Sequence, residues 1–102
     1  MTMSDAIYTA DNIRTLLRPV FDAYNVSSAI LFGSYAKGNA DDTSDVDILV
    51  DSGLKGLRFF GLLEGVTSAL EIPVDMIDVS QIDRGSEIEQ EILKTGVRIY
   101  GQ

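Results

Sequence analysis

The sequence predicts an α/β fold of the α+β kind, with one mixed sheet of about four strands flanked by helices. Three observations carry this prediction. Helical spacing of apolar residues alternates with short apolar runs along the chain. Hydrophobic residues make up 45% of 102 residues, enough for the core of one domain, which we assign to residues 1–102. No repeat, low-complexity tract or linker divides the chain.

The first predicted helix follows a leader, residues 1–8, that we expect to be loose. Thr9 is a suitable N-cap, and Asp11 falls in the first turn, where a carboxylate is favourable. Pro19 removes one backbone donor, so we expect it to kink or restart the helix. Asn25 is the expected stop. The apolar face comprises Ile13, Leu16, Leu17, Val20, Phe21 and Tyr24.

Strand-like and helical segments then alternate to the end of the chain. The predicted strands are 28–32, 45–51, 74–79 and 97–100, and the predicted helices are 34–37, 57–70 and a last helix beginning after Ser80 or Ser86. Gly38 and Gly96 are expected to end the short and last helices. Gly61 and Gly65 should let another backbone approach the 57–70 helix. The inward residues expected are Leu62, Leu63, Val66, Ala69 and Leu70, then Ile88, Ile92 and Leu93.

Composition excludes several classes of site. The chain has no cysteine and no histidine, so any metal must be held by oxygen ligands, which favours magnesium, manganese or calcium. The net charge of −8 argues against tight binding of nucleic acid, and we read the glutamates at 87, 89 and 91 as a solvated helix face. No apolar run is long enough to span a bilayer, and the N-terminus does not resemble a signal peptide. We therefore expect a cytoplasmic protein.

Two aspartates mark the centre of the predicted site. Asp45 and Asp47 are expected at the start of a strand with their side chains on one face, where two charges about 6–7 Å apart repel unless a cation lies between them. Gly33 and Ser34 form a strand-to-helix turn that can seat a phosphate group. Asp75 is expected on another strand. If the two strands are neighbours, three carboxylates meet beside a phosphate seat, as two-metal phosphoryl transfer requires.

Two competing motifs fail at specific positions. A P-loop beginning at Gly33 would need Lys and Ser or Thr where Asn39 and Ala40 stand. A calcium-binding loop beginning at Asp41 would need glycine where Val46 stands. The remaining acidic residues of this loop, Asp41, Asp42 and Asp51, are expected to be solvated. Tyr35 is expected to pack, and Asp78 to end or cap a strand.

These motifs resemble those of a known family. The segment from Gly33 to Gly38, the segment Ser44–Val50 and the pair Val74-Asp75 are similar to the nucleotidyltransferase superfamily of DNA polymerase β, in its minimal nucleotidyltransferase (MNT) branch. The resemblance implies that Gly33, Ser34 and Lys37 bind the nucleotide, and that Asp45, Asp47 and Asp75 are catalytic residues that hold two magnesium ions, or manganese. It further implies transfer of a nucleoside monophosphate, AMP from ATP, to a hydroxyl group.

The minimal members of this family that the chain resembles often occur as antitoxins beside a helical HEPN-domain toxin. The resemblance therefore implies an acceptor hydroxyl on a HEPN-type partner protein, which would be silenced by the attached AMP. The alternative is a binding module without catalysis, which neutralises the partner by occlusion. The sequence leaves open the nucleotide, the acceptor, the choice between catalysis and occlusion, and whether the chain forms a homo- or hetero-oligomer.

Overall fold

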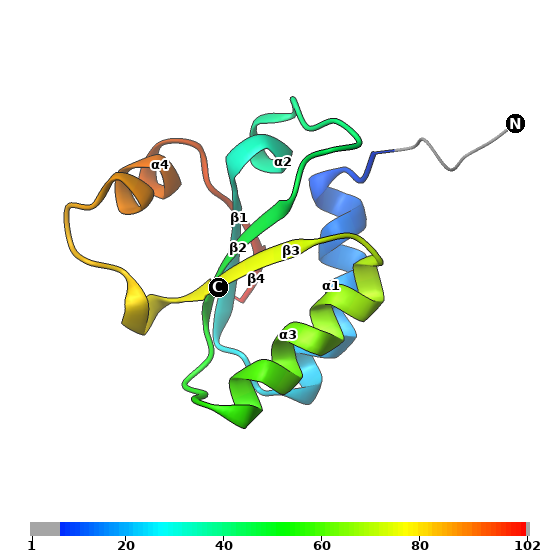
Figure 1. The fold of residues 1–102 in the computed structure, drawn as a ribbon, viewed down its shortest axis with the longest axis vertical. Helices are drawn as coiled ribbons and strands as arrows, with labels where there is room; N and C mark the ends of the chain where they lie inside the picture. Colours follow the sequence, from blue (N-terminus) through cyan, green and yellow to red (C-terminus); the bar gives the residue numbers. More distant parts are fainter. Residues whose placement is uncertain (1–6, 102) are drawn as a thin grey trace, which may run out of the picture.

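The computed structural model describes residues 7–101 and contains helices on both sides of a four-stranded sheet (Figure 1). The elements are α1 (Ala10–Ala23), β1 (Ser28–Phe32), α2 (Gly33–Lys37), β2 (Val46–Asp51), α3 (Leu57–Leu70), β3 (Val74–Asp78), the 3₁₀ turn η1 (Val79–Gln81), α4 (Glu87–Thr95) and β4 (Val97–Tyr100). The predicted alternation of helices and strands is therefore confirmed. In the described part of the chain, no helix has the length and apolar character that crossing a bilayer requires.

The sheet is mixed, with strand order β3-β2-β1-β4. β1 pairs antiparallel with both β2 and β4, whereas β2 and β3 run parallel. α3 forms the crossover between these parallel strands, as such a connection requires. Because β2 and β3 are neighbours, the condition for bringing Asp47 and Asp75 together is met.

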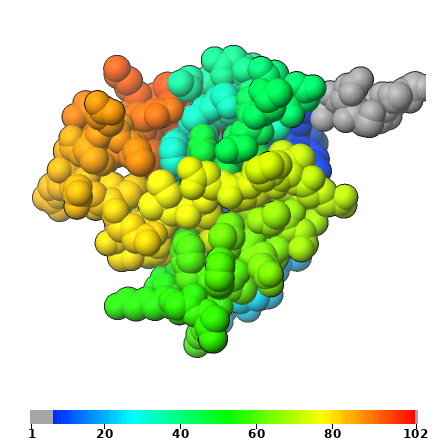
Figure 2. Space-filling model, in the orientation of Figure 1, coloured from blue at the N-terminus to red at the C-terminus, as the bar shows by residue number. Residues whose placement is uncertain are grey.

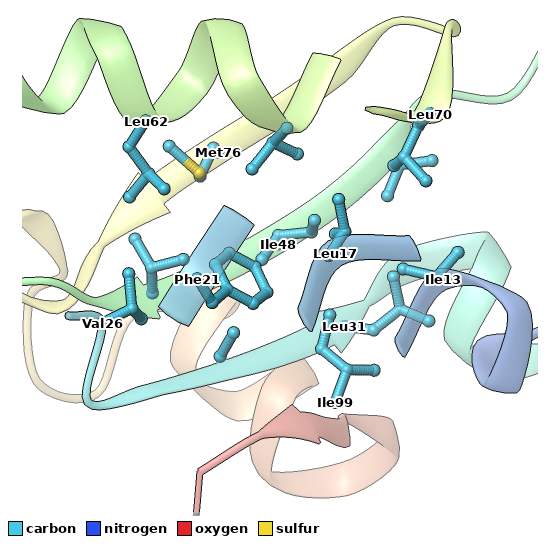
Figure 3. Packing of buried hydrophobic residues seen from close by; sticks show 14 of the residues in the cluster. Ile13, Leu17, Phe21, Val26, Leu31, Ile48, Leu62, Leu70, Met76 and Ile99 are labelled. Atoms are coloured by element: carbon cyan, nitrogen blue, oxygen red, sulfur yellow. The ribbon is translucent and has the colours of Figure 1, made fainter. Parts of the chain in front are cut away.

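One face of the sheet carries the hydrophobic core. Alternate residues of β2, namely Val46, Ile48 and Val50, are fully buried on this face. α1 and α3 lie together over it, and Figure 3 shows Leu17 and Phe21 of α1 facing Leu62 of α3 and Ile48 of the sheet. The glycines of α3 do allow a close approach, but to side chains of α1 rather than to the backbone that we expected: a Cβ on Gly65 would lie 3.0 Å from a side-chain carbon of Val20.

The opposite face is only partly covered. α4 lies on this side (Figure 1) and buries Ile92, but Leu93 is 80% exposed and Ile88 39% exposed. The prediction that Ile88 and Leu93 face inward was therefore wrong, because this short helix buries only Ile92. The helix begins at its N-cap Ser86, whose hydroxyl accepts a hydrogen bond from the Glu89 amide. Ser80 instead lies in η1.

The ends of α1 follow the predicted chemistry. The Thr9 hydroxyl accepts a hydrogen bond from the Asn12 amide, and Asn25 ends the helix region with a φ of +55°. Pro19 does not restart the helix, which continues through it to Ala23. The described end of the predicted leader is anchored, because the Tyr8 hydroxyl donates a 2.7 Å hydrogen bond to the Leu70 carbonyl. Residues 1–6 of that leader lie outside the described residues.

Candidate functional site

The candidate site lies on the partly covered face of the sheet, where β2 and β3 begin. Asp47 and Asp75 are direct partners in the parallel register, so their Cα atoms lie about 4.8 Å apart on adjacent strands. Both alternate with buried residues of the core face, which places both carboxylates on the opposite face. The register thus brings together two of the three predicted catalytic aspartates.

Gly33 lies directly against Asp47. It begins α2 with a φ of +74°, and a Cβ built on it would lie only 2.3 Å from Oδ2 of Asp47. Only glycine fits here, since a side chain would have to occupy the position of the carboxylate. The turn after β1 and the carboxylate of β2 therefore share one small space.

The turn itself is well defined by its backbone. The Ser34 carbonyl accepts hydrogen bonds from the amides of Gly38 and Asn39, and Gly38 ends α2 in the left-handed conformation, as predicted. α2 has five residues, so its dipole is small and a phosphate seat here depends on individual N–H groups and the Ser34 hydroxyl. The nucleotide-binding role of Gly33 and Ser34 stays a prediction that this geometry fits.

The electrostatics of the site centre on Asp47. Partial burial, together with the nearby charges of Asp75, Asp45 and Glu91, raises the pKa of Asp47 from its usual value of 3.8 to about 6. The carboxylate is thus held in a place where its negative charge is unfavourable. A cation beside it would relieve this cost.

Asp45 lies outside the strand that we expected to contain it. β2 begins at Val46, so Asp45 is an exposed residue at the end of the preceding loop. Asp41 organises that loop, because its carboxylate accepts hydrogen bonds from the Thr43 amide and hydroxyl and from the Ser44 hydroxyl. These bonds lower the pKa of Asp41. Asp41 is exposed, as predicted, but it also shapes the loop that carries Asp45.

The carboxylates of the site bear on the prediction of a metal ion. Within residues 7–101, no three acidic side chains are already grouped as a metal cage. The donor chemistry nevertheless fits magnesium, since Asp47 and Asp75 offer adjacent carboxylate oxygens and Asp47 gains from a neighbouring cation. The roles of Asp45, Asp47 and Asp75 as metal ligands therefore remain predictions.

Lys37 forms a contact that the sequence did not indicate. Its ammonium group lies 3.6 Å from a carboxylate oxygen of Glu91, which joins the end of α2 to α4. We expected Glu91 to belong to a solvated helix face, but it is only partly exposed and its charge acts on Asp47. No spacing rule relates residues 54 positions apart in sequence, so only the tertiary structure reveals this pair.

Two other predicted roles are confirmed as structural. Asp78 is buried and caps η1, and its carboxylate accepts hydrogen bonds from the amides and hydroxyls of Ser52 and Ser80. Burial alone would raise the pKa of Asp78, but these hydrogen bonds outweigh it and lower the pKa. Tyr35 is buried in the core, where desolvation raises its pKa. Neither residue belongs to the site.

A protein family and several individual proteins match most of the chain in sequence. Residues 16–102 match the family described as "Polymerase beta, Nucleotidyltransferase". The "Putative protein adenylyltransferase MJ1215" of Methanocaldococcus jannaschii is 35% identical over 86 residues, which cover 78% of this chain and 100% of that protein. The "Protein adenylyltransferase MntA" of Thermococcus cleftensis is 33% identical, covering 78% of this chain and 87% of that one.

Solved structures share the fold. A chain of the "Crystal structure of the toxin-antitoxin with AMP-PNP" superposes with a TM-score of 0.73 at 24% identity, covering 87% of this chain and 73% of that chain. A complex of the tri-AMPylated Shewanella oneidensis HEPN toxin with MNT antitoxin gives a TM-score of 0.61 at 25% identity, covering 91% and 70% of the two chains. The family match over residues 16–102 and the relatives at 33–35% identity show that the chain belongs to the polymerase beta-type nucleotidyltransferase family.

Proposed function

We propose that this chain transfers AMP from ATP to a hydroxyl group of a partner protein. The observation that carries the proposal is the register pairing of Asp47 with Asp75 beside the Gly33–Ser34 turn. Family membership supports nucleotidyl transfer, and the relatives named as protein adenylyltransferases support AMP and a protein acceptor. The alignments cover 100% and 87% of the lengths of these two relatives, so the similarity is not confined to a fragment of either one.

The reaction can be assigned to residues of this chain. The acceptor oxygen attacks the α-phosphorus of ATP, the bond from that phosphorus to the bridging oxygen breaks, and pyrophosphate leaves. The N–H groups of the Gly33–Ser34 turn and the Ser34 hydroxyl hold the phosphates, and the Lys37 ammonium group adds a point charge. Asp75 is exposed at the start of β3, so it can take the proton of the acceptor hydroxyl.

Magnesium, when bound, would neutralise charge on the phosphates and activate the acceptor oxygen. Asp47 and Asp75 would hold it, with Asp45 as the third ligand from the adjoining loop. The raised pKa of Asp47 supports this assignment, because a carboxylate that is unfavourably charged without metal gains the most from a cation.

We further propose that the acceptor is a HEPN-type protein. In the Shewanella oneidensis complex, the HEPN toxin is tri-AMPylated and is bound to an MNT antitoxin. The resemblance of the whole fold to that antitoxin complex supports a similar pairing for this chain. The carboxylates of the site are also accessible, since Asp75 is exposed and Asp47 is partly exposed, so a protein surface can reach them.

The direct test is incubation of the purified chain with α-labelled ATP, magnesium and, as the candidate acceptor, the purified product of the adjacent gene. Label should appear on a hydroxyl side chain of the partner, and mass spectrometry should locate one or more AMP groups. Asp47→Asn and Asp75→Asn variants should fold but give no label. The Asp42→Asn variant is the matched control, since it removes one exposed loop charge outside the site.

Occlusion without catalysis predicts a different outcome. In that case a variant carrying both Asp45→Asn and Asp47→Asn would still bind and neutralise the partner. The proposal would be overturned if this double variant still neutralised the partner and the wild-type chain transferred no label to the partner from any nucleoside triphosphate. Loss of neutralisation with retained binding would exclude occlusion.

A further inference from the structure

The ion pair between Lys37 and Glu91 joins two elements that both border the site. Lys37 is the last residue of α2 and Glu91 lies in α4, and the two helices contact each other (Figure 2). Between them lies a cleft of about 290 Å³ lined by Lys37, Glu87, Gln90, Glu91, Lys94 and Thr95. Both charged side chains are about two-fifths exposed, at 44% and 39%, so a ligand can reach them.

The position of Lys37 on α2 relates it to the phosphate seat. Lys37 follows Gly33 by four residues, so the two lie on the same side of the short helix. A lysine side chain has four flexible bonds, and holding its ammonium group in one place costs conformational entropy. A carboxylate that already restrains this group would lower the cost of using it on a ligand.

The negative charges around Asp47 limit how Glu91 could assist the binding of a nucleotide. Four carboxylates lie close enough to interact: the charges of Asp45, Asp75 and Glu91 all raise the pKa of Asp47. Taken alone, the Glu91 carboxylate should repel a triphosphate. It can favour binding only through the cation that it holds.

We propose that Glu91 is a positioning residue for the nucleoside triphosphate, holding the Lys37 ammonium group in the α2–α4 cleft ready to meet the phosphates. The proposal rests on the proposed function, since it assigns a nucleotide to the Gly33–Ser34 turn. It predicts that removing a negative charge at Glu91 weakens the binding of an anion, the reverse of the general electrostatic effect.

Equilibrium binding of ATP with magnesium, measured by calorimetry, tests this without relying on activity. Glu91→Gln should weaken ATP binding about threefold to fivefold, the upper range for exposed ion pairs. Lys37→Met should weaken it roughly tenfold or more, as loss of a charge-assisted hydrogen bond predicts. The matched control is Glu87→Gln, which removes the same charge from the same cleft without an ion pair to Lys37, and should leave ATP binding equal or tighter.

A double variant shows whether Glu91 acts through Lys37. Glu91→Gln should have no further effect in the Lys37→Met background, because the ammonium group it positions is gone. ATP binding by Glu91→Gln as tight as wild type, or an additive loss in the double variant, would overturn the inference. Absence of ATP binding by the wild-type chain would instead overturn the proposed function. Thermal unfolding of each variant checks that the fold is kept.

Discussion

Gly33 and Asp47 occupy one shared space, in which the Asp47 Oδ2 atom lies 2.3 Å from where a Cβ on Gly33 would stand. This relationship links the end of β1 to the start of β2 and places a carboxylate beside the turn that we assign to phosphate binding. It also explains why the turn begins with glycine, since both the φ of +74° and the lack of space exclude other residues.

Gly33→Ala should therefore reduce both stability and nucleotide binding. We expect a loss of about 2–3 kcal/mol in the free energy of unfolding, from backbone strain and displacement of Asp47. ATP binding should fall below detection. Gly38→Ala is the matched control, because Gly38 also has a positive φ but has no atom within 4 Å of the added Cβ. It should cost about 1 kcal/mol in urea unfolding and keep ATP binding.

Because of Asp47, the free energy of unfolding of the metal-free protein should fall as the pH rises. Its pKa is about 6 in the folded protein and near 3.8 otherwise, so the folded state binds this proton more tightly between about pH 4 and pH 6. Ionisation across that window should remove about 1 kcal/mol of stability, after allowance for solvent screening. Asp47→Asn should be the more stable protein at pH 7, with the difference gone near pH 4. Urea unfolding in the presence of a chelator measures this, and equal pH profiles for the two proteins would contradict it.

Magnesium should offset the repulsion among the aspartates of the site and so stabilise the folded chain. Magnesium with ATP should raise the melting temperature of the wild-type chain, since any ligand of the folded state stabilises it. Asp45→Asn should leave metal-free stability unchanged or higher, because Asp45 is an exposed loop residue beside like charges. It should also abolish the stabilisation by magnesium and ATP. A large loss of metal-free stability would show that Asp45 has a structural role instead.

Asp78 should behave in the opposite way to the site aspartates. Asp78→Ala would leave the Ser52 and Ser80 amides and hydroxyls without their acceptor, at a cost of about 2–4 kcal/mol. Because hydrogen bonds lower the pKa of Asp78, its stabilising effect is present above its unfolded pKa near 3.8 and is lost as the pH falls below it. The folded fraction of the variant should bind ATP normally. Denaturant unfolding and calorimetry separate the two effects.

Tyr8→Phe tests the anchored end of the leader. The Tyr8 hydroxyl bonds to the Leu70 carbonyl at 2.7 Å in a partly buried place, so its removal should cost about 1 kcal/mol. Tyr24→Phe offers a comparison, because its hydroxyl lies against Gly61 rather than in this bond. No loss in Tyr8→Phe would show that this hydrogen bond does not stabilise the fold.

Much of the fold follows from local patterns. The bounds of α3, β1 and β4 agree with the predicted segments, because apolar spacing and flanking glycines act over a few residues. The prediction failed for Ile88 and Leu93, where only the depth of contact with the sheet decides which residues of an amphipathic helix are buried. It also failed for Asp45, since the pairing of strands rather than alternation sets where β2 begins.

The sequence by itself determined the kinds of group in the candidate site: a glycine-serine turn, aspartate carboxylates, and no cysteine or histidine. Only the tertiary structure decided how they meet. The β2–β3 register sets Asp47 beside Asp75, and the contact of α2 with α4 sets Lys37 beside Glu91. Residues far apart in the chain are brought together by strand pairing and packing, which depend on the whole core, and no local spacing encodes such contacts.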